Sequence, residues 1–497
     1  MPWARLVSGP WPVLCVLAVQ AVLSLRLAWS NTAFTDEALY LWAGHLQWAH
    51  WMHGTPIPAF PTYFSGAPVI YPPLGALADS IGGLTGARIL SLAFMLGATC
   101  LLWATTSRLF GKRAAFFAAA LWALLGPTLK LGAFATFDPL STCLLAASAW
   151  CAVRTGASRE FTRWTVLGAA AMVTANAAAY SSAIFDPVIV AVALLAAWPR
   201  PTVKVAMMRA ASLGAYAVSG LILLATAAGG LYSTGIGQTV LSRSSGDDPL
   251  PVVLAQAAGW TAAVVIVAVA GTVFGLAAQG PHSRRTLVAV LTAAALLVPV
   301  EQARIHTTVS LDKHVDFGAW LASIAAGYAL AKLTRLPGRA KMRAAACVAC
   351  GGVAVLLAVP AYAQAQGLYG WANSAQFAAV FRPLAEHSTG PMLVETPSPA
   401  RYYLGDAIPW QRWSSTWAVT TPSGKSIGAQ PGVDAPGVAR VYVRLITHGF
   451  FTLVALNADA TPGLDQEIIN AITRSHGYRL VSRVPYGASS YVIWERM

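Results

Sequence analysis

The sequence has few charged residues, and this scarcity sets the class of protein. Only 10% of its 497 residues are Asp, Glu, Lys or Arg, whereas 56% are hydrophobic and the mean hydropathy is +0.58. Soluble domains usually carry about 25% charged residues, because their surfaces must be hydrated. An ordinary soluble protein is therefore excluded, and most of the surface is expected to face lipid.

Cysteine is also scarce, and its placement argues against a disulfide framework. All six cysteines fall in or beside apolar segments, and none follows Cys350. Cys347 and Cys350 form a CxxC pair, a spacing that can bind metal or undergo redox chemistry. With no second pair and an apolar setting, both are better interpreted as small buried side chains.

Acidic residues are fewer than basic ones: 19 Asp and Glu stand against 33 Lys and Arg, and the formal net charge is +14. Such an excess can indicate nucleic-acid binding. Here the basic residues stand in short clusters between apolar runs, which is typical of cytoplasmic loops. No basic domain or interleaved aromatic patch is left over, so no nucleic-acid partner is expected.

Long apolar runs fill the first three quarters of the chain. A spanning helix needs about 20 apolar residues, and helices satisfy their own backbone groups in lipid. The runs predict about eleven transmembrane helices, near residues 10–29, 87–107, 114–129, 139–153, 164–181, 184–198, 206–228, 252–278, 286–300, 315–331 and 344–363. The third run is the weakest and is also compatible with a shallow hairpin formed with the fourth.

The distribution of Lys and Arg predicts the orientation. Seventeen basic residues fall before the first predicted span or in the loops after even-numbered spans, and only four fall in the alternate loops. Cytoplasmic loops are the ones enriched in Lys and Arg. The N-terminus is therefore predicted to be cytoplasmic and the C-terminus, after an odd number of spans, extracytoplasmic.

The composition changes after the last apolar run. Residues 364–497 contain more Pro, Asp and Glu, and short strand-like runs at 450–456, 478–484 and 490–494 flank a helix-like segment at 462–475. This pattern is typical of a small α/β domain. We therefore predict an α-helical polytopic membrane domain over residues 1–363 and an extracytoplasmic α/β domain over residues 364–497.

The first outward loop holds two acids beside the membrane. Asp36 and Glu37 follow the first span and lead into an apolar, aromatic stretch. A carboxylate close to hydrocarbon is costly and often functional. Capping of an interfacial helix by Thr35 or Asp36 is an equally good explanation of the residues alone. The histidines of this loop at 45, 50 and 53 match no firm metal-ligand spacing, so a wet interfacial face is favoured.

Two later outward loops also hold candidate site residues. Asp138 stands before Pro139 at the head of the fourth span, where a simple helix start is the favoured explanation on its own. The fifth outward loop gathers charged and titratable residues: Glu301, Arg304, His306, Asp312, Lys313, His314 and Asp316. Cations at the membrane surface suit a lipid phosphate, and a solvated loop is the alternative.

Three of these segments, taken in order, resemble a known superfamily. TDEALY at 35–40, YPPL at 71–74 and TFDP at 136–139 are similar to motifs of the GT-C membrane glycosyltransferases. The likeness is to the group of families 39 and 83, the protein O-mannosyltransferases and aminoarabinose transferases. SLDKH at 310–314 is only a positional counterpart of that group's later phosphate motif.

The resemblance implies a reaction and assigns roles. A sugar would pass, with inversion, from a polyprenyl-phosphate donor to an acceptor hydroxyl on a protein, lipid or glycan at the outer face of the membrane. Asp36 would be the general base, with Glu37 and Asp138 shaping the catalytic pocket. Lys313, Arg304 and His314 would bind the donor phosphate, and a divalent metal ion stays an open option. A transporter or lipid-sugar flippase is the alternative, although the sequence contains no inverted repeats and no mid-span charges.

Overall fold

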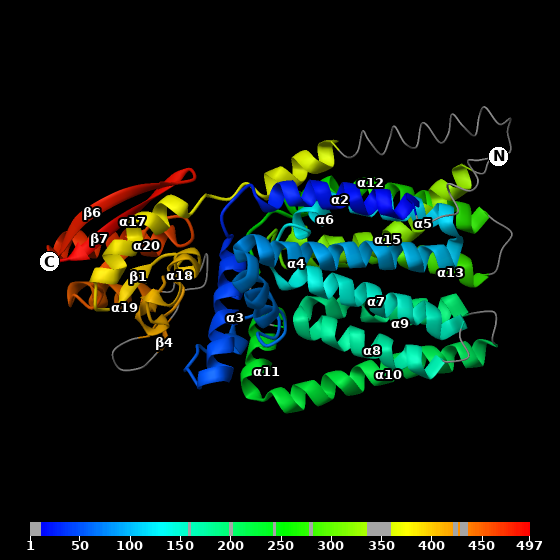
Figure 1. Ribbon diagram of the computed structural model, residues 1–497, viewed down its shortest axis with the longest axis horizontal. Coiled ribbons are helices and arrows are strands. Elements are labelled where there is room, and N and C mark those ends of the chain that lie inside the picture. The colour runs from blue at the N-terminus through cyan, green and yellow to red at the C-terminus, as the bar shows by residue number, and fades with distance from the viewer. Residues whose placement is uncertain are drawn as a thin grey trace. The chain divides into compact units, whose positions relative to one another are not determined.

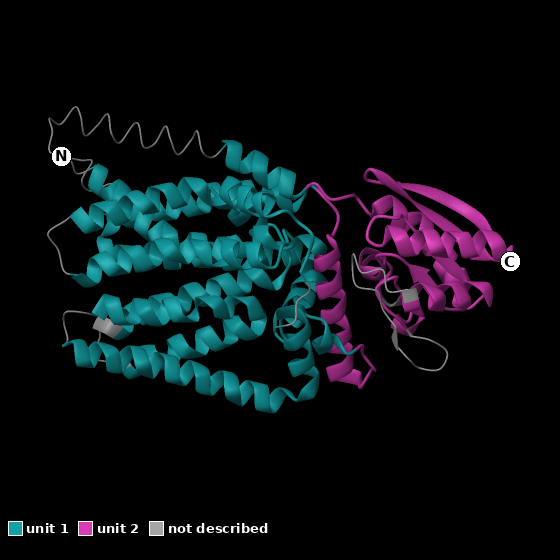
Figure 2. Ribbon diagram, turned by 180° about the vertical axis from the view of Figure 1, so that it is seen from behind, with its two compact units in different colours: residues 1–30, 59–369 teal, residues 31–58, 370–497 magenta. Residues whose placement is uncertain are grey.

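The computed structural model describes residues 11–157, 161–197, 202–241, 245–277, 282–334, 359–420, 426–427 and 436–497. Its contacts divide the chain into two compact units, shown in Figure 2. Unit 1 comprises residues 1–30 and 59–369, and unit 2 comprises residues 31–58 and 370–497. The helix of the loop after the first span thus groups with the C-terminal residues. The functional division between residues 363 and 364 stays a prediction.

Unit 1 is a helical bundle, most of whose helices run side by side (Figure 1). Its helices are α2 (Trp11–Ala28), α4 (Tyr71–Phe110), α5 (Lys112–Ala123), α6 (Gly126–Leu131), α7 (Phe137–Ala157), α8 (Phe161–Ala178), α9 (Asp186–Ala197), α10 (Val203–Ala228), α11 (Gly230–Ile236), α12 (Leu250–Ala277), α13 (His282–Ala293), α14 (Leu297–Arg304) and α15 (Leu311–Leu333). Short helical turns connect them at η1 (Phe60–Thr62), η2 (Tyr180–Phe185), η3 (Gly237–Leu241) and η4 (Ala294–Leu296).

Each of the first ten predicted spans coincides with one helix or with consecutive helical segments. The third is divided between α5 and α6, because Pro127 lies in the first turn of α6, where its missing N–H needs no partner. The ninth is divided among α13, η4 and α14. The eleventh, 344–363, falls mainly outside the described residues.

The chain is a multi-pass membrane protein. In the part that the structure describes, six helical segments are long and apolar enough to cross a membrane: Trp11–Ala28, Tyr71–Phe110, Tyr180–Ala197, Val203–Ala228, Leu250–Ala277 and His282–Arg304. α4 begins well before its predicted span and bends at Gly82 and Gly83, where φ is +61° at Gly83. Glycine tolerates this backbone conformation, which other residues rarely adopt.

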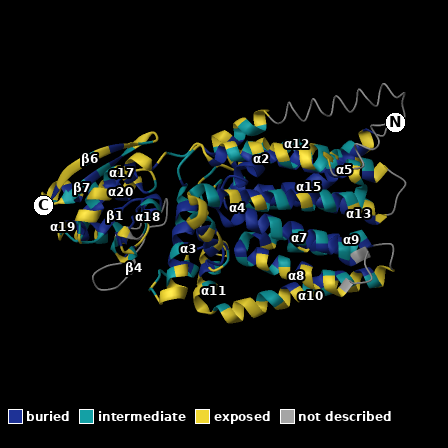
Figure 3. Ribbon diagram, in the orientation of Figure 1, coloured by how far each residue is buried: buried dark blue, intermediate teal, exposed yellow. Residues whose placement is uncertain are grey.

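The core of unit 1 forms around α15, which is buried along nearly its whole length (Figure 3). Small residues allow its neighbours to approach closely. A Cβ atom added at Gly271 of α12 would lie 2.5 Å from the Ala325 carbonyl oxygen, and one added at Gly318 of α15 would lie 2.7 Å from that of Ala294. Close approach of this kind is how helices gain packing energy in lipid, where no hydrophobic effect drives them together.

Unit 2 is built on a five-stranded sheet with the order β2-β1-β5-β7-β6. Strands β1 (Met392–Val394), β2 (Trp413–Ser414) and β5 (Leu453–Leu456) are parallel, and β6 (Tyr478–Tyr486) and β7 (Ser489–Arg496) complete it in antiparallel register. A two-stranded sheet joins β3 (Val419–Thr420) to β4 (Ser426–Ile427). The helices are α3 (Thr35–His53), α17 (Ala375–His387), α18 (Ser398–Leu404), α19 (Pro436–Thr447) and α20 (Pro462–Ser475).

The predicted α/β character of this region is confirmed. The expected strands correspond to β5, β6 and β7, and the expected helix to α20. Two apolar clusters fill the unit, one on each side of β1 and β5: Phe381, Met392 and Ile493 belong to the first, and Leu393 and Ile468 to the second. Because successive strand residues point to opposite faces, Met392 and Leu393 contribute to different clusters.

Candidate active site

The candidate site in unit 1 begins at the head of α7. Asp138 lies in the first turn of this helix and is only 1% exposed. The Thr136 hydroxyl donates to Asp138 Oδ2 at 2.8 Å, and the Thr142 hydroxyl donates to the Asp138 carbonyl oxygen at 2.9 Å. The Asp138 carboxylate is therefore oriented through Oδ2, whereas Oδ1 accepts no hydrogen bond from the described residues.

The first turn of α15 brings cations to the same unit. Lys130 of α6 forms an ion pair with Asp312. The next residue in the sequence, Lys313, is buried. The amines of Lys130 and Lys313 both lie near the ring of Phe134, at 4.9 and 5.9 Å from its centroid. Desolvated cations of this kind bind anions more strongly than solvated ones, because little water competes.

His314 connects these cations with Asp138. Its Nε2 atom lies 3.8 Å from Asp138 Oδ1 and 3.3 Å from the Ser181 hydroxyl of η2. Its ring stacks on that of Phe317, one turn further along α15. Of the residues that the sequence assigned to the site, the structure therefore brings Asp138 and His314 together, with Lys313 adjacent.

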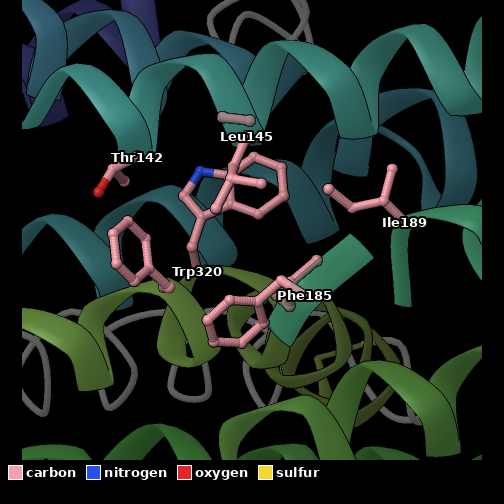
Figure 4. Close-up of a pocket in the computed structure, with 8 residues that line it drawn as sticks. Thr142, Leu145, Phe185, Ile189 and Trp320 are labelled. Atoms are coloured by element: carbon pink, nitrogen blue, oxygen red, sulfur yellow. The ribbon is translucent and has the colours of Figure 1, made fainter. Parts of the chain in front are cut away.

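An apolar cavity lies one turn below these polar groups. Figure 4 shows Thr142 and Leu145 of α7, Phe185, Ile189 of α9 and Trp320 of α15 around it. Phe317 also lines it, next to His314 in the stack. The cavity volume of about 10 Å³ is room for a single water molecule, so in this structure it is a packing gap and not a ligand pocket.

Arg304, the third predicted phosphate ligand, is placed differently. It ends α14, its side chain is 67% exposed, and its guanidinium donates two hydrogen bonds to Glu301 at 2.7 and 2.9 Å. This is a bidentate surface ion pair, a geometry that orients the guanidinium plane.

The acids of the loop after the first span lie in unit 2, at the start of α3. Glu37 is fully buried, and its Oε2 accepts from the Phe34 backbone N–H at 2.9 Å. Phe34 is the N-cap residue, and Glu37 bonds back to it from inside the helix, whereas Thr35 and Asp36 occupy the first two helical positions. Asp36 lies half-buried in the same first turn. The aromatic stretch after it packs inward, with the Arg401 guanidinium 5.0 Å from the centre of the Trp42 ring.

Sequence reasoning missed Asp186. This residue begins α9, accepts from the Asn176 amide at 2.6 Å, and has its Oδ1 buried without a partner in the described part of the chain. A signal was available, because Phe-Asp-Pro occurs twice, at 137–139 and at 185–187.

Comparisons with known proteins agree with this architecture. Residues 75–226 match the model of the family described as dolichyl-phosphate-mannose-protein mannosyltransferase. The chain is also similar in structure to ArnT from Cupriavidus metallidurans bound to undecaprenyl phosphate, with 16% identity, 98% of each chain covered and a TM-score of 0.60. The chain has the GT-C fold. The predicted resemblance to the GT-C glycosyltransferases is thereby confirmed.

Two further GT-C structures align at lower coverage of their own chains. Archaeal oligosaccharyltransferase AglB from Archaeoglobus fulgidus, solved with an inhibitory peptide and a dolichol-phosphate, has 12% identity and a TM-score of 0.59 over 90% of this chain and 69% of its own. Arabinofuranosyltransferase AftD from Mycobacteria has 17% identity and a TM-score of 0.57 over 98% and 41%. No curated protein sequence matches the chain.

Proposed function

We propose that this GT-C protein transfers a sugar from a polyprenyl-phosphate donor to an acceptor hydroxyl, with inversion, at the extracytoplasmic face of the membrane. The N-terminus is cytoplasmic and unit 2 extracytoplasmic, as the Lys and Arg distribution indicates. The acceptor is a protein, lipid or glycan hydroxyl.

One observation carries the proposal. Asp138, His314 and buried Lys313 gather at the heads of α7 and α15, in a fold shared with a protein that was crystallised with undecaprenyl phosphate. A histidine and a desolvated cation suit the phosphate of such a lipid, because positive charge stabilises the phosphate oxygens.

The reaction needs one base and a stabilised leaving group. The Asp36 carboxylate accepts the proton of the acceptor hydroxyl, whose oxygen forms a bond to the anomeric carbon. The bond from that carbon to the phosphate oxygen breaks, and its electron pair leaves with the polyprenyl phosphate. Phosphate is a good leaving group, so positive charge near its oxygens replaces a general acid.

The cations have distinct parts in this scheme. Lys313 and His314 stabilise the charge that develops on the departing phosphate, and Arg304 attracts the anionic donor from the surface. Asp138 orients His314, and Glu37 holds the first turn of α3, and so Asp36, in place.

A divalent metal ion would add positive charge at the same phosphate. Among the described residues, no three Asp, Glu, His or Cys side chains gather closely enough to hold one. No step of the scheme uses a metal ion.

Carrier release from a defined donor tests the proposal. The purified protein is incubated with a panel of polyprenyl-phosphate sugars, and free polyprenyl phosphate is measured with and without candidate acceptors. Release that depends on an acceptor supports glycosyl transfer. Movement of intact sugar lipid between leaflets of a proteoliposome, without release, would instead support the flippase alternative.

A further inference from the structure

Three helices meet at the end of unit 1 opposite the head of α7. The last turns of α7 pack there against the first turns of α8 and α10, and Figure 1 shows the three helices side by side. Gly168 of α8 permits the close approach, because a Cβ atom added to it would lie 3.0 Å from Cys151 Cβ of α7 and 3.2 Å from Leu213 Cδ1 of α10. The Ser148 hydroxyl of α7 donates to the Gly168 carbonyl oxygen at 2.9 Å. The distribution of Lys and Arg predicts that this end of the bundle is cytoplasmic.

Arg154, in the last turn of α7, lies against two indole rings at this junction. Its guanidinium carbon is 5.6 Å from the centre of the Trp150 ring and 4.7 Å from that of Trp164 on α8. Both distances are in the range of a cation–π interaction, which strengthens where the cation is partly desolvated. The two rings therefore hold the guanidinium at the end of the bundle.

The hydrogen-bonding capacity of this guanidinium is unused. The Nε atom of Arg154 is buried without a partner, and none of its nitrogens forms a hydrogen bond or an ion pair with a described residue. The two terminal nitrogens are accessible from the surface. A guanidinium carries five N–H donors, and its planar fork matches two oxygens of one phosphate or carboxylate. The missing partner is therefore an anion that approaches from outside the bundle.

Two further arginines bring positive charge to the same place. The guanidinium carbon of Arg163 lies 5.8 Å from the centre of the Trp164 ring, so Arg154 and Arg163 share one ring. Arg209 of α10 donates through Nη1 to the carbonyl oxygen of Thr155 at 3.1 Å, next in sequence to Arg154. Like charges that gather in this way repel each other, and a bound anion relieves the repulsion.

The surface beside these cations identifies the anion as a lipid headgroup. Leu167, one turn after Trp164 on α8, is 46% exposed, and Met208, directly before Arg209 on α10, is 52% exposed. Exposed apolar side chains of a membrane bundle face hydrocarbon. A soluble phosphate compound would gain nothing from that surface, whereas the acyl chains of a phospholipid would cover it. Basic pockets between membrane helices on the cytoplasmic side are known to bind anionic headgroups.

We propose that Arg154, together with Arg163 and Arg209, binds the phosphate of an anionic phospholipid in the leaflet at this end of unit 1. The headgroup accepts hydrogen bonds from the Arg154 guanidinium, and the acyl chains lie along α8 and α10. The site is at the opposite end of α7 from Asp138 and does not depend on the proposed glycosyl transfer.

Lipid titration of the full-length protein in a neutral detergent tests the site. Native mass spectrometry measures the Kd values of dioctanoyl phosphatidylglycerol, dioctanoyl phosphatidylcholine and inorganic phosphate, and wild type should bind the phosphatidylglycerol most tightly. Arg154→Gln should raise the Kd of phosphatidylglycerol by about 10–150-fold, as expected for a lost hydrogen bond between charged groups. Arg108→Gln, at an exposed arginine in the last turn of α4, removes one charge at the same end and should leave that Kd unchanged.

Arg154→Lys separates charge from geometry. It keeps the positive charge but loses the planar donors, so it should bind phosphatidylglycerol with an intermediate Kd, and it replaces Arg154→Gln as the test variant if the latter does not fold. Equal losses in Arg154→Gln and Arg108→Gln would indicate general attraction to a basic face and overturn the site. Wild-type affinity no higher for phosphatidylglycerol than for phosphatidylcholine would do the same. Inorganic phosphate bound as tightly as phosphatidylglycerol would make the ligand a soluble anion and contradict the lipid assignment.

Discussion

His314 Nε2 lies 3.8 Å from Asp138 Oδ1, within range of an electrostatic interaction but too far for a hydrogen bond. The two side chains come from α15 and α7, so the gap between them depends on how these helices pack. When one residue acts through another, the effects of substituting each of them do not add in the double variant. In a double-mutant cycle, Asp138→Asn with His314→Gln should lower kcat/KM little more than the worse single variant. Independent, multiplying losses would show that the two residues act separately.

Asp36 is the assigned general base. Asp36→Asn keeps the size of the side chain and removes the basic oxygen, so turnover should fall by about 10²–10⁴-fold, the usual contribution of general-base catalysis. Donor binding should persist, because it depends on the cations of unit 1. Glu467→Gln, at an exposed acid on α20, is the matched control. Near-normal transfer by Asp36→Asn at equal expression would remove Asp36 from the mechanism.

Lys313 should matter for binding more than for folding. Lys313→Ala removes a buried cation that we assign to the donor phosphate, and a lost charged contact of about 1.5–3 kcal/mol weakens affinity about 10–150-fold. Lys332→Ala, at the exposed far end of the same helix, should leave the Kd unchanged. Arg304→Ala should have a smaller effect than Lys313→Ala, since its solvated guanidinium already pairs with Glu301. Equal Kd values for Lys313→Ala and wild type would contradict the phosphate assignment.

A pair of buried carboxylates makes unit 2 sensitive to pH. Five consecutive backbone N–H groups, from Asn457 to Thr461, donate to the Glu395 carboxylate and stabilise its charge. Asp465 lies beside it and accepts from the Thr461 hydroxyl at 3.2 Å. Burial, followed by the charge of Glu395 and a hydrogen bond to it, raises the pKa of Asp465 to about 8. Asp465 is therefore protonated in the folded protein at neutral pH.

The folded and unfolded states bind the Asp465 proton over different pH ranges. The unfolded chain loses the Asp465 proton near pH 4, whereas the folded chain keeps it until about pH 8. Across that window the folded state binds more protons, so stability falls as pH rises, by at most about 1.4 kcal/mol per pH unit. Hydrogen exchange of β5 and α20 amides in the full-length protein should quicken from pH 5 to pH 8, after correction for intrinsic rates. Asp465→Asn should flatten that dependence, and an unchanged slope would contradict the raised pKa of Asp465.

Topology is tested by accessibility from outside the cell. In a background without native cysteines, Gln466→Cys on α20 should react with an impermeant thiol reagent in intact cells, because unit 2 is assigned to the outer face. Lys204→Cys at the start of α10 should react only after permeabilisation. Both positions are exposed in the structure, so burial does not confound the comparison. Labelling of both sites in intact cells, or of the α10 site alone, would overturn the assigned orientation.

Periodicity and apolar length predicted the helices of unit 1 well, because each helix must satisfy its backbone and cover the lipid thickness by itself. They predicted the start of a helix incorrectly where polar residues or glycines interrupt the apolar run. The start of α4 at Tyr71 was missed since Asp79 and the Gly82–Gly83 bend interrupt the apolar run, although the helix continues through them. In unit 2 the long C-terminal strands were predicted, whereas β1 and β2 have only three and two residues. Strands so short are fixed by their neighbours in the sheet and not by their own pattern.

By itself, the sequence determined that this is a polytopic membrane protein with a small C-terminal α/β region, and three short motifs indicated the GT-C fold. Those features depend on composition, segment length and local order along the chain. Only the tertiary structure decided which polar residues meet. It paired Lys130 with Asp312 and placed the His314 ring between Asp138 and Ser181. These residues are far apart in the sequence and are brought together by helix packing, a geometry that the residue types alone do not specify.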